Sequence, residues 1–426
     1  MKIETIWIFS LIVFTSLKVS GNSARRLGKL DTQNWLTHSY LGQNQSPYQK
    51  SETIPDFSPI GALLSDDGIL GTATLISPDI IITAAHVIKN KTLDPLPTPS
   101  DWEFILYHDF SSAPSSLRFG IESFTIHPDW ISRQEINPPW GDGDTYGVDV
   151  AIARLSNPVI GYQPLCLPDS ESLNEGQKVF IAGYGTLVEG KTGKQNDENS
   201  KRMVGENILD RVVKEVKLDS ELVSGGLLAF DFDSPNGNSN RLGLENATLG
   251  PLPAGSSDSI PLTFEVSTAE GDSGGPLIAF KNQKWRIFGT VSYGSSDSTY
   301  GDVTVLTRLQ NHLDWIYQNL SIWPTAKLLS TSGWKESDWF GVFIPYSSGW
   351  SYHVRLGWFW SITKTADSVW FYVEHLGWLW TSLSTFPYLF SSGENDWLYL
   401  DLNNTDNSKW RTYHFSLSNW QLNTIQ

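Results

Sequence analysis

Cysteine is nearly absent from this sequence: Cys166 is the single one in 426 residues, so no disulfide can form within the chain. A chain of this length can bury enough apolar surface to fold without such bonds, and it exceeds the usual size of one core. Two domains are therefore expected. Cys166 lies between Leu165 and Leu167, a context typical of a buried, unreactive side chain.

Basic residues are scarce relative to acidic ones. The chain has 30 Lys and Arg against 46 Asp and Glu, a formal net charge of −16. This balance argues against nucleic acid and anionic lipid as partners, because both repel a negative surface. We expect no cofactor and no metal. A calcium loop at Asp142 and Asp144 is the less favoured alternative to a solvated loop there.

Long apolar runs are absent beyond the N-terminus. Residues 6–17 form an apolar run that is too short to span a bilayer, with Lys2 before it and Lys18 closing it. Small residues follow, so the pattern predicts a signal peptide over residues 1–21, with a retained anchor as the alternative. The mature protein is then expected to be exported, either secreted or held at the cell surface or in the periplasm, without a membrane span.

Between residues 58 and 322 the sequence favours β-structure. Short β-branched segments recur there, punctuated by Gly, Pro, Asp and Ser, as in all-β barrels and sandwiches. An apolar stripe with helical spacing predicts one helix over residues 309–320. Residues 22–57 are polar and aperiodic, which indicates a leader or a loosely packed arm. The predicted strands are residues 71–76, 80–83, 104–107, 150–155, 179–182, 285–293 and 303–306.

Tryptophan is concentrated past Pro324, where it recurs with a period near 20 residues. Residues 356–360 (LGWFW), for example, match residues 376–380 (LGWLW). Such a period predicts an array of β-hairpins, forming a small repeat domain over residues 325–426. Flat aromatic rings can stack on sugars, so a cell-surface glycan is a candidate partner. The favoured alternative is that the tryptophans fill the core of the repeat.

One hexapeptide, Gly271 to Pro276 (GDSGGP), has a composition that packing does not explain. Its glycines and proline weaken a strand and suit a tight loop that lifts the hydroxyl of Ser273 into solvent. A serine becomes a nucleophile only with a base and an orienting acid nearby. His86, after a strand-like run (TAAHV), is the candidate base, and Asp149, at the start of an apolar strand (DVAIARL), is the candidate acid.

These three motifs, in the order His86, Asp149, Ser273, resemble those of the trypsin-like serine peptidases. The resemblance covers about residues 59–320 and implies an all-β fold: two six-stranded antiparallel β-barrels with the site between them, followed by a short C-terminal helix. It implies that Ser273 attacks the scissile carbonyl, His86 moves the proton and Asp149 orients His86. It also implies an oxyanion hole made by the N–H groups of Gly271 and Ser273.

The same resemblance identifies the segment that would hold the substrate backbone. It places Ser292 beside the buried acid, and it implies that Ser292, Tyr293 and Gly294 pair with the substrate as an extra strand. Gly294 also leaves one wall of the primary pocket open.

Specificity follows from the residues that the resemblance places in the primary pocket. Ser267 takes its floor and Thr304 one wall. A neutral floor disfavours a charged side chain, which predicts a preference for small or medium apolar side chains before the scissile bond. The alternative, in which Asp302 or Glu270 supplies an acid to the pocket, predicts basic side chains instead.

The chain also departs from the family pattern. Val87 and Ala269 stand where many members have cysteines. In the family, a freed N-terminus pairs with the acid before the nucleophile, here Asp272, but no sequence of that kind precedes His86. The activation step therefore stays open.

Two functions follow as hypotheses. The first is an exported serine endopeptidase that hydrolyses protein or peptide substrates through an acyl-enzyme intermediate. The second is a weak or inactive protease-fold protein that binds a cell wall or glycan through its aromatic repeats. The presence of all three candidate catalytic residues favours the first.

Overall fold

The structure is a computed structural model that describes residues 25–28 and most of residues 54–424. The predicted signal peptide and the predicted domain boundary between residues 322 and 325 lie outside the described residues. The gaps within 54–424 are residues 78, 158, 160–161, 169–170, 194, 197–198, 219–220, 224, 244–249, 295–297, 321–325, 330–332, 347–349, 366–367 and 402–408.

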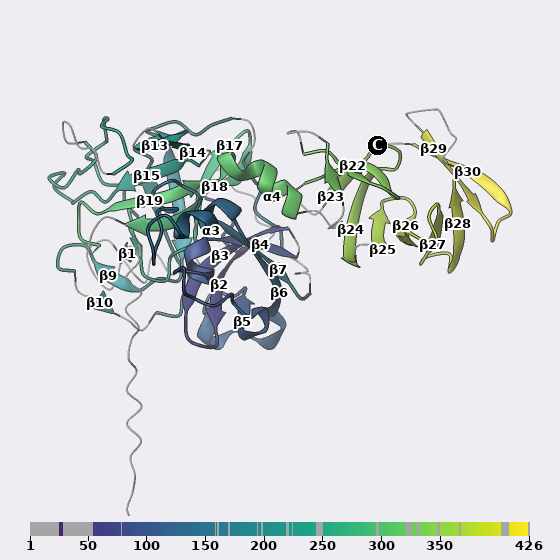
Figure 1. The fold of residues 1–426 in the computed structure, drawn as a ribbon, viewed down its shortest axis with the longest axis horizontal. Helices are drawn as coiled ribbons and strands as arrows, with labels where there is room; N and C mark the ends of the chain where they lie inside the picture. Colours follow the sequence, from purple (N-terminus) through teal and green to yellow (C-terminus); the bar gives the residue numbers. More distant parts are fainter. Residues whose placement is uncertain are drawn as a thin grey trace, which may run out of the picture.

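The first barrel is closed by six antiparallel strands in the order β2-β3-β4-β7-β6-β5 (Figure 1). Its interior is apolar, with Leu63, Leu75, Ile81 and Phe104 fully buried. The predicted strand at 104–107 begins and ends two residues earlier than expected. The strands are β2 Ile60–Ser65, β3 Leu70–Ser77, β4 Ile80–Thr83, β5 Trp102–Ile105, β6 Arg118–Ile126 and β7 Ala151–Leu155.

The second barrel is a seven-stranded sheet in the order β11-β8-β17-β18-β19-β15-β12. Its two outer strands follow one another in the chain: β11 pairs with β8, and after a bend at Leu209 and Asp210 the chain pairs with β15 as β12. β11 and β12 thus act as one bent strand, so the second barrel has six strand positions, as expected for this fold. The strands are β8 Lys178–Gly183, β11 Met203–Ile208, β12 Arg211–Val213, β15 Leu227–Asp231, β17 Pro276–Lys281, β18 Lys284–Gly294 and β19 Val303–Arg308.

The predicted helix over 309–320 begins as a 3-10 turn, η4, and continues as the α-helix α4. Leu309, Ile316 and Leu320 are buried, and they join a core that both barrels share. The helices are α2 Ala85–Ile88, α3 Pro128–Gln134, α4 Leu313–Asn319, η1 Pro99–Asp101, η2 Phe110–Ser112, η3 Ser115–Leu117 and η4 Leu309–His312.

Two small sheets lie beside the second barrel. In one of them a piece of the predicted leader, β1, runs antiparallel to β16 and parallel to β9, so this piece is paired rather than loose. Cys166 is partly exposed, so the expectation that it is buried was wrong. The strands of the two small sheets are β1 Arg25–Gly28, β9 Leu187–Glu189, β10 Gln195–Asn196, β16 Thr268–Ala269, β13 Val216–Leu218 and β14 Glu221–Val223.

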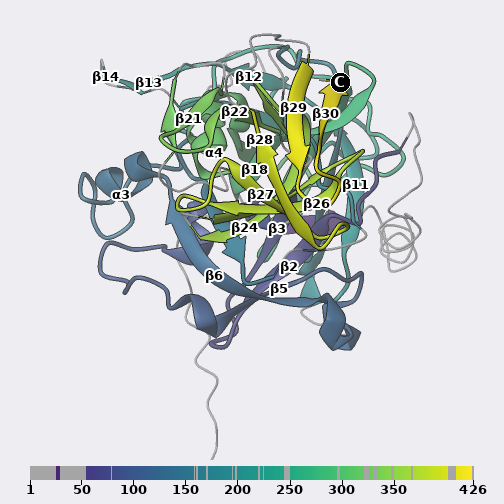
Figure 2. The same ribbon diagram turned by 90° about the vertical axis from the view of Figure 1, so that its right-hand side faces the viewer.

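Past α4 the chain forms an eleven-stranded antiparallel sheet in which each strand pairs with the next in sequence (Figures 1 and 2). We call it the tail sheet. Gly357 and Gly377, one repeat apart, have φ of 73° and 72°, a conformation that glycine permits at the turn before each strand. Its strands are β20 Lys327–Leu328, β21 Lys335–Ser337, β22 Gly341–Pro345, β23 Trp350–His353, β24 Gly357–Thr365, β25 Ser368–Val373, β26 Gly377–Ser382, β27 Tyr388–Ser391, β28 Asp396–Leu400, β29 Lys409–His414 and β30 Asn419–Thr424.

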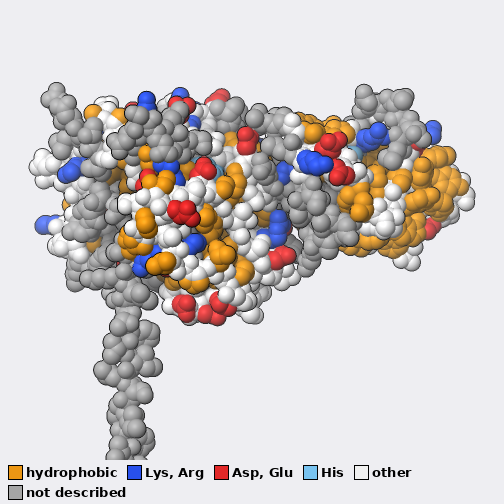
Figure 3. Space-filling model, viewed as in Figure 1, with side chains coloured by type: hydrophobic (Ala, Val, Ile, Leu, Met, Phe, Trp, Pro, Cys, Tyr) orange, Lys and Arg blue, Asp and Glu red, His pale blue; other side chains and the backbone are white. Residues whose placement is uncertain are grey.

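The two faces of the tail sheet differ sharply. Side chains alternate along its strands, so that Phe371 is fully buried while its neighbour Trp370 is 39% exposed. Phenylalanine and leucine dominate the buried face, and among the described tryptophans of the tail sheet only Trp410 is buried. The interpretation that the tryptophans fill the core was therefore wrong. Figure 3 shows the other face as a broad apolar surface on the tail.

Candidate active site

The hexapeptide forms the tight loop between β16 and β17. Gly271 and Gly274 have φ of 95° and 79°, which favours glycine at both positions. A Cβ on Gly274 would also lie 2.0 Å from Oγ1 of Thr83. The N–H of Thr72 donates to the carbonyl of Ser273 at 2.8 Å, and the N–H of Gly274 donates to that of Val291 at the same distance. The loop is thus held by both barrels.

His86 and Asp149 are brought together by neighbouring strands of the first barrel. β4 and β7 pair so that Thr83 lies opposite Ala151. His86 follows β4, in the first turn of α2, and Asp149 precedes β7, so both lie at the same end of this strand pair. The imidazole Nδ1 is 2.7 Å from Oδ2 of Asp149, and the N–H of His86 donates to Oδ1 at 2.9 Å.

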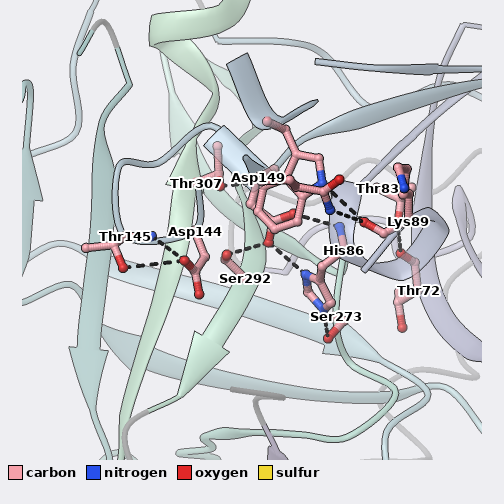
Figure 4. Close-up of polar contacts among 12 residues, drawn as sticks. Thr72, Thr83, His86, Lys89, Asp144, Thr145, Asp149, Ser273, Ser292 and Thr307 are labelled. Atoms are coloured by element: carbon pink, nitrogen blue, oxygen red, sulfur yellow. Dashed lines mark hydrogen bonds and ion pairs between the residues drawn. The ribbon is translucent and has the colours of Figure 1, made fainter. Parts of the chain in front are cut away.

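The serine hydroxyl completes the chain of contacts between the barrels. Nε2 of His86 lies 2.8 Å from Oγ of Ser273 (Figure 4). Asp149 is fully buried and Ser273 is 5% exposed. The structure therefore brings together the three residues that the sequence singled out as base, acid and nucleophile.

Two further hydroxyls hold Asp149. Ser292 donates to Oδ2 of Asp149, the position that the family resemblance implied for it. Thr307, on β19, donates to the Asp149 carbonyl at 3.0 Å, a contact that no motif in the sequence indicated. The bond from Ser292 compensates the buried carboxylate in part for the water that it loses, and the bond from Thr307 fixes the backbone of Asp149.

Charge and burial act in opposite directions on His86. Burial disfavours the imidazolium, but the charge and hydrogen bond of Asp149, with a smaller contribution from Asp144, more than offset it. The pKa of His86 is therefore raised above its ordinary value of 6.5. Asp149 thus stabilises the protonated imidazole that a general base must become.

Two backbone donors at the loop are open. In the part of the chain that the structure describes, no hydrogen bond uses the N–H of Gly271 or of Ser273. Gly271 has a positive φ, a backbone conformation that would be strained in a residue with a side chain. Open N–H groups on either side of Asp272 suit the binding of a negatively charged oxygen.

The residues predicted for the primary pocket lie together. The hydroxyls of Ser267 and Thr304 are 3.0 Å apart, and Thr268 contacts Thr304 at the same distance. Thr304 lies opposite Gly294 in the pairing of β18 with β19, and Tyr293 lies opposite Val305. Ser267 and Thr304 are both fully buried, so their mutual contact occupies the space between them.

The two acids of the alternative pocket are placed differently. Asp302 is 2% exposed, and its carboxylate accepts the N–H of Val303 at 2.9 Å. Glu270 is exposed on the surface. Neither arrangement favours an acid at the base of the pocket.

Asp272 is fully buried beside the nucleophile. Its carboxylate accepts the N–H of Gly185 at 2.8 Å and that of Ala269 at 2.9 Å. A Cβ on Gly185 would lie 2.6 Å from the Asp272 carboxylate, so this close approach requires glycine. No motif in the sequence indicated this role of Gly185.

The acidic loop before β7 is held by an ion pair. Asp142 pairs with Arg133, whose Nε is 3.1 Å from Oδ1 of Asp142. Among the described residues, no group of three or more His, Cys, Asp or Glu side chains could hold a metal ion. Asp144, by contrast, lies within electrostatic reach of His86 and Asp149.

Comparisons with known proteins agree with this geometry. The profile of the trypsin family matches residues 44–239 and 257–316. Transmembrane protease serine 11G of Mus musculus is 26% identical over 270 residues, which are 62% of this chain and 53% of the mouse protein. Phenoloxidase-activating factor 3 of Holotrichia diomphalia is 27% identical over 272 residues, 58% of this chain and 63% of that protein.

A third relative, CLIP domain-containing serine protease B10 of Anopheles gambiae, is 25% identical over 269 residues, 58% of this chain and 60% of its own length. The chain thus spans between 53% and 63% of the length of these three relatives. No helix among the described residues is long and apolar enough to cross a membrane. The chain has two barrels, with His86, Asp149 and Ser273 in contact between them, and the family profile matches more than half of its length. The chain therefore belongs to the trypsin family.

Proposed function

We propose that the protein is an exported serine endopeptidase, with His86, Asp149 and Ser273 as its catalytic residues. The observation that carries the proposal is the unbroken contact from Asp149 Oδ2 through both ring nitrogens of His86 to Oγ of Ser273. Export rests on the N-terminal apolar run alone.

The reaction follows from these contacts. Oγ of Ser273 attacks the scissile carbonyl carbon while its proton passes to Nε2 of His86, and the N–H groups of Gly271 and Ser273 receive the oxyanion. The intermediate collapses, the C–N bond breaks, and His86 gives its proton to the leaving amine. Water then attacks the acyl-enzyme ester, His86 takes a proton from the water, and Ser273 regains it as the acid leaves.

A preference for small or medium apolar side chains before the scissile bond is part of the proposal. The hydroxyls of Ser267 and Thr304 meet across the pocket and leave little depth. A lysine or arginine side chain would find no acid at its floor and would bury its charge unpaired.

A fluorophosphonate probe tests the proposal directly. Because the probe reacts only with an activated serine, it should label the wild-type chain and leave Ser273→Ala unlabelled. Peptidase activity should fall about 10⁶-fold in that variant. A folded, mature wild-type preparation that resists labelling would favour the inactive binding protein instead.

We propose further that the tail sheet holds the peptidase on a polysaccharide surface. The exposed face presents Trp358, Trp370 and Trp420, each between 39% and 46% exposed, on β24, β25 and β30. Aromatic faces of this kind can stack on the apolar faces of sugar rings. This attachment is compatible with catalysis, since the triad lies on the other part of the chain.

Retention on insoluble cell-wall glycan tests the attachment. The full chain should be retained, and the triple variant Trp358→Ala, Trp370→Ala, Trp420→Ala should elute while keeping its rate on soluble peptides. Equal retention of both proteins would show that these side chains do not bind the glycan.

A further inference from the structure

A second carboxylate, that of Asp144, lies next to the triad. Asp144 is placed by the loop before β7, where its carbonyl accepts the N–H of Gly147 at 3.0 Å. Its side chain is within electrostatic reach of His86, Asp149 and the hydroxyl of Tyr293. Figure 4 shows one of its oxygens turned toward Thr145 and the other turned away.

The carboxylate of Asp144 has an open acceptor. Oδ1 accepts the N–H of Thr145 at 2.8 Å and its hydroxyl at 3.4 Å. Among the described residues, no hydrogen bond uses Oδ2, and no lysine or arginine forms an ion pair with Asp144. The neighbouring loop acid, Asp142, is neutralised by Arg133, so this lack of a cation is particular to Asp144.

The electrostatic setting of Asp144 is unfavourable in the free protein. Burial and the nearby charge of Asp149 both raise its pKa, and the hydrogen bonds from Thr145, together with the charge of His86, only partly offset them. A half-buried carboxylate beside a second one gains most from a cation that arrives from outside. Asp149 cannot serve that cation, because its oxygens already accept from His86 and Ser292.

The path of a bound substrate leads past Asp144. The reacting carbonyl must lie at Oγ of Ser273, and its side chain must enter the pocket of Ser267 and Thr304. The preceding residues extend along Ser292 to Gly294 if they pair with that strand edge. The residue directly before the one in the pocket would then lie toward His86 and Tyr293, and the charge of Asp144 acts on both of these groups.

We infer that Asp144 is a specificity-determining residue that binds the lysine or arginine side chain of the substrate residue directly before the one in the primary pocket. The inference rests on the proposed peptidase function and deepens it: the substrate class becomes peptides with a cationic residue followed by a small apolar one. The inference places the basic side chain two residues before the scissile bond, away from the neutral floor of the primary pocket.

Acetylated peptide substrates with alanine in the primary position test the inference, since they carry no free amine. The preceding residue is arginine, lysine or the uncharged isostere norleucine. Wild type should cleave the arginine and lysine peptides with kcat/KM about tenfold or more above the norleucine peptide, chiefly through KM. Asp144→Asn should lose this preference and keep its rate on norleucine, and the preference should weaken as salt is added.

Glu270→Gln is the matched control, because it removes another acid close to the nucleophile loop and should keep the preference. Loss of the preference in Glu270→Gln but not in Asp144→Asn would overturn the inference. So would a wild type that is labelled by fluorophosphonate yet does not distinguish arginine from norleucine. A wild type that is neither labelled nor active overturns the peptidase function itself, and the inference with it.

Discussion

At the scale of single residues, the depth of the primary pocket depends on one side chain. Thr304 fills the space opposite Ser267 and bonds to both Ser267 and Thr268. In the proposed peptidase, we therefore expect the volume of Thr304, rather than a charge, to limit which side chains the pocket accepts.

Thr304→Gly should therefore admit larger side chains. Because a methylene of extra room is worth about 10–200-fold in discrimination, kcat/KM for phenylalanine relative to alanine should rise at least about tenfold. Thr304→Ser, which keeps the hydroxyl, is the control and should change the ratio little. An unchanged ratio in Thr304→Gly would mean that another group limits the pocket. Competition between the two peptides in one reaction gives the ratio directly.

The acid limb of the pH profile depends on His86. A protonated imidazole cannot accept the proton of Ser273, so kcat/KM should fall as pH decreases through the pKa of His86. Since Asp149 raises that pKa, the midpoint should lie above 6.5. Asp144→Asn should move it to lower pH, because Asp144 raises the same pKa. A midpoint at or below 6.5 in wild type would contradict this account of the site.

At the scale of elements, each strand of the tail sheet separates two kinds of aromatic residue. On β25, Phe371 packs against Phe340 and Phe359 with ring centroids 5.7 and 5.8 Å away, inside the core. Trp370, on the opposite face, touches Phe390 at 6.5 Å and is open to solvent. Adjacent residues of the strand thus contribute to the core and to the proposed binding surface.

Substitution of these neighbours should separate the two roles. Phe371→Ala creates a cavity and should lower the free energy of unfolding of the tail sheet by about 3–5 kcal/mol. Trp370→Ala should cost under about 1 kcal/mol, as for other surface positions. Urea unfolding followed by tryptophan fluorescence measures both. Equal losses in the two variants would show that the exposed aromatic face also stabilises the sheet.

At the scale of the whole molecule, two parts with separate cores share one chain. The buried residues of the tail sheet form a cluster that contains none from the barrels. The nearest barrel element along the chain is α4, and Figure 1 shows the tail sheet extending beyond it. Because the two cores are separate, we expect the proposed binding by the tail sheet to leave the geometry of His86, Asp149 and Ser273 unchanged.

Much of this organisation could be predicted from the sequence, and the reasons differ by residue. Ser273, His86 and Asp149 stand in short motifs whose residue types have no packing explanation. The sequence alone therefore identified them as candidate catalytic residues. Asp144 was not, because a carboxylate in a loop looks the same in sequence whether it faces solvent or the triad. Only the pairing of β4 with β7 brings its loop to His86.

The tail shows the opposite limit. Its period predicted a repeat of β-hairpins, but period alone does not tell which face of a strand is buried. The sequence favoured the bulky tryptophans for the core, whereas Phe371, Leu379 and Leu389 take it. When both faces of a sheet carry aromatic residues, the alternation of apolar and polar residues along a strand no longer indicates which face is buried.

The lack of cross-links has a consequence for where the enzyme can work. Val87 and Ala269 are buried in apolar clusters, and Cys166 is the only sulfhydryl of the chain. Because apolar packing rather than disulfide bonds stabilises these positions, the proposed peptidase should keep its full rate in excess dithiothreitol. A rate assay with and without the reductant measures this. A loss of activity would point to a bond between chains through Cys166. We therefore expect the proposed peptidase to work in oxidising and reducing surroundings alike, including anaerobic media rich in thiols.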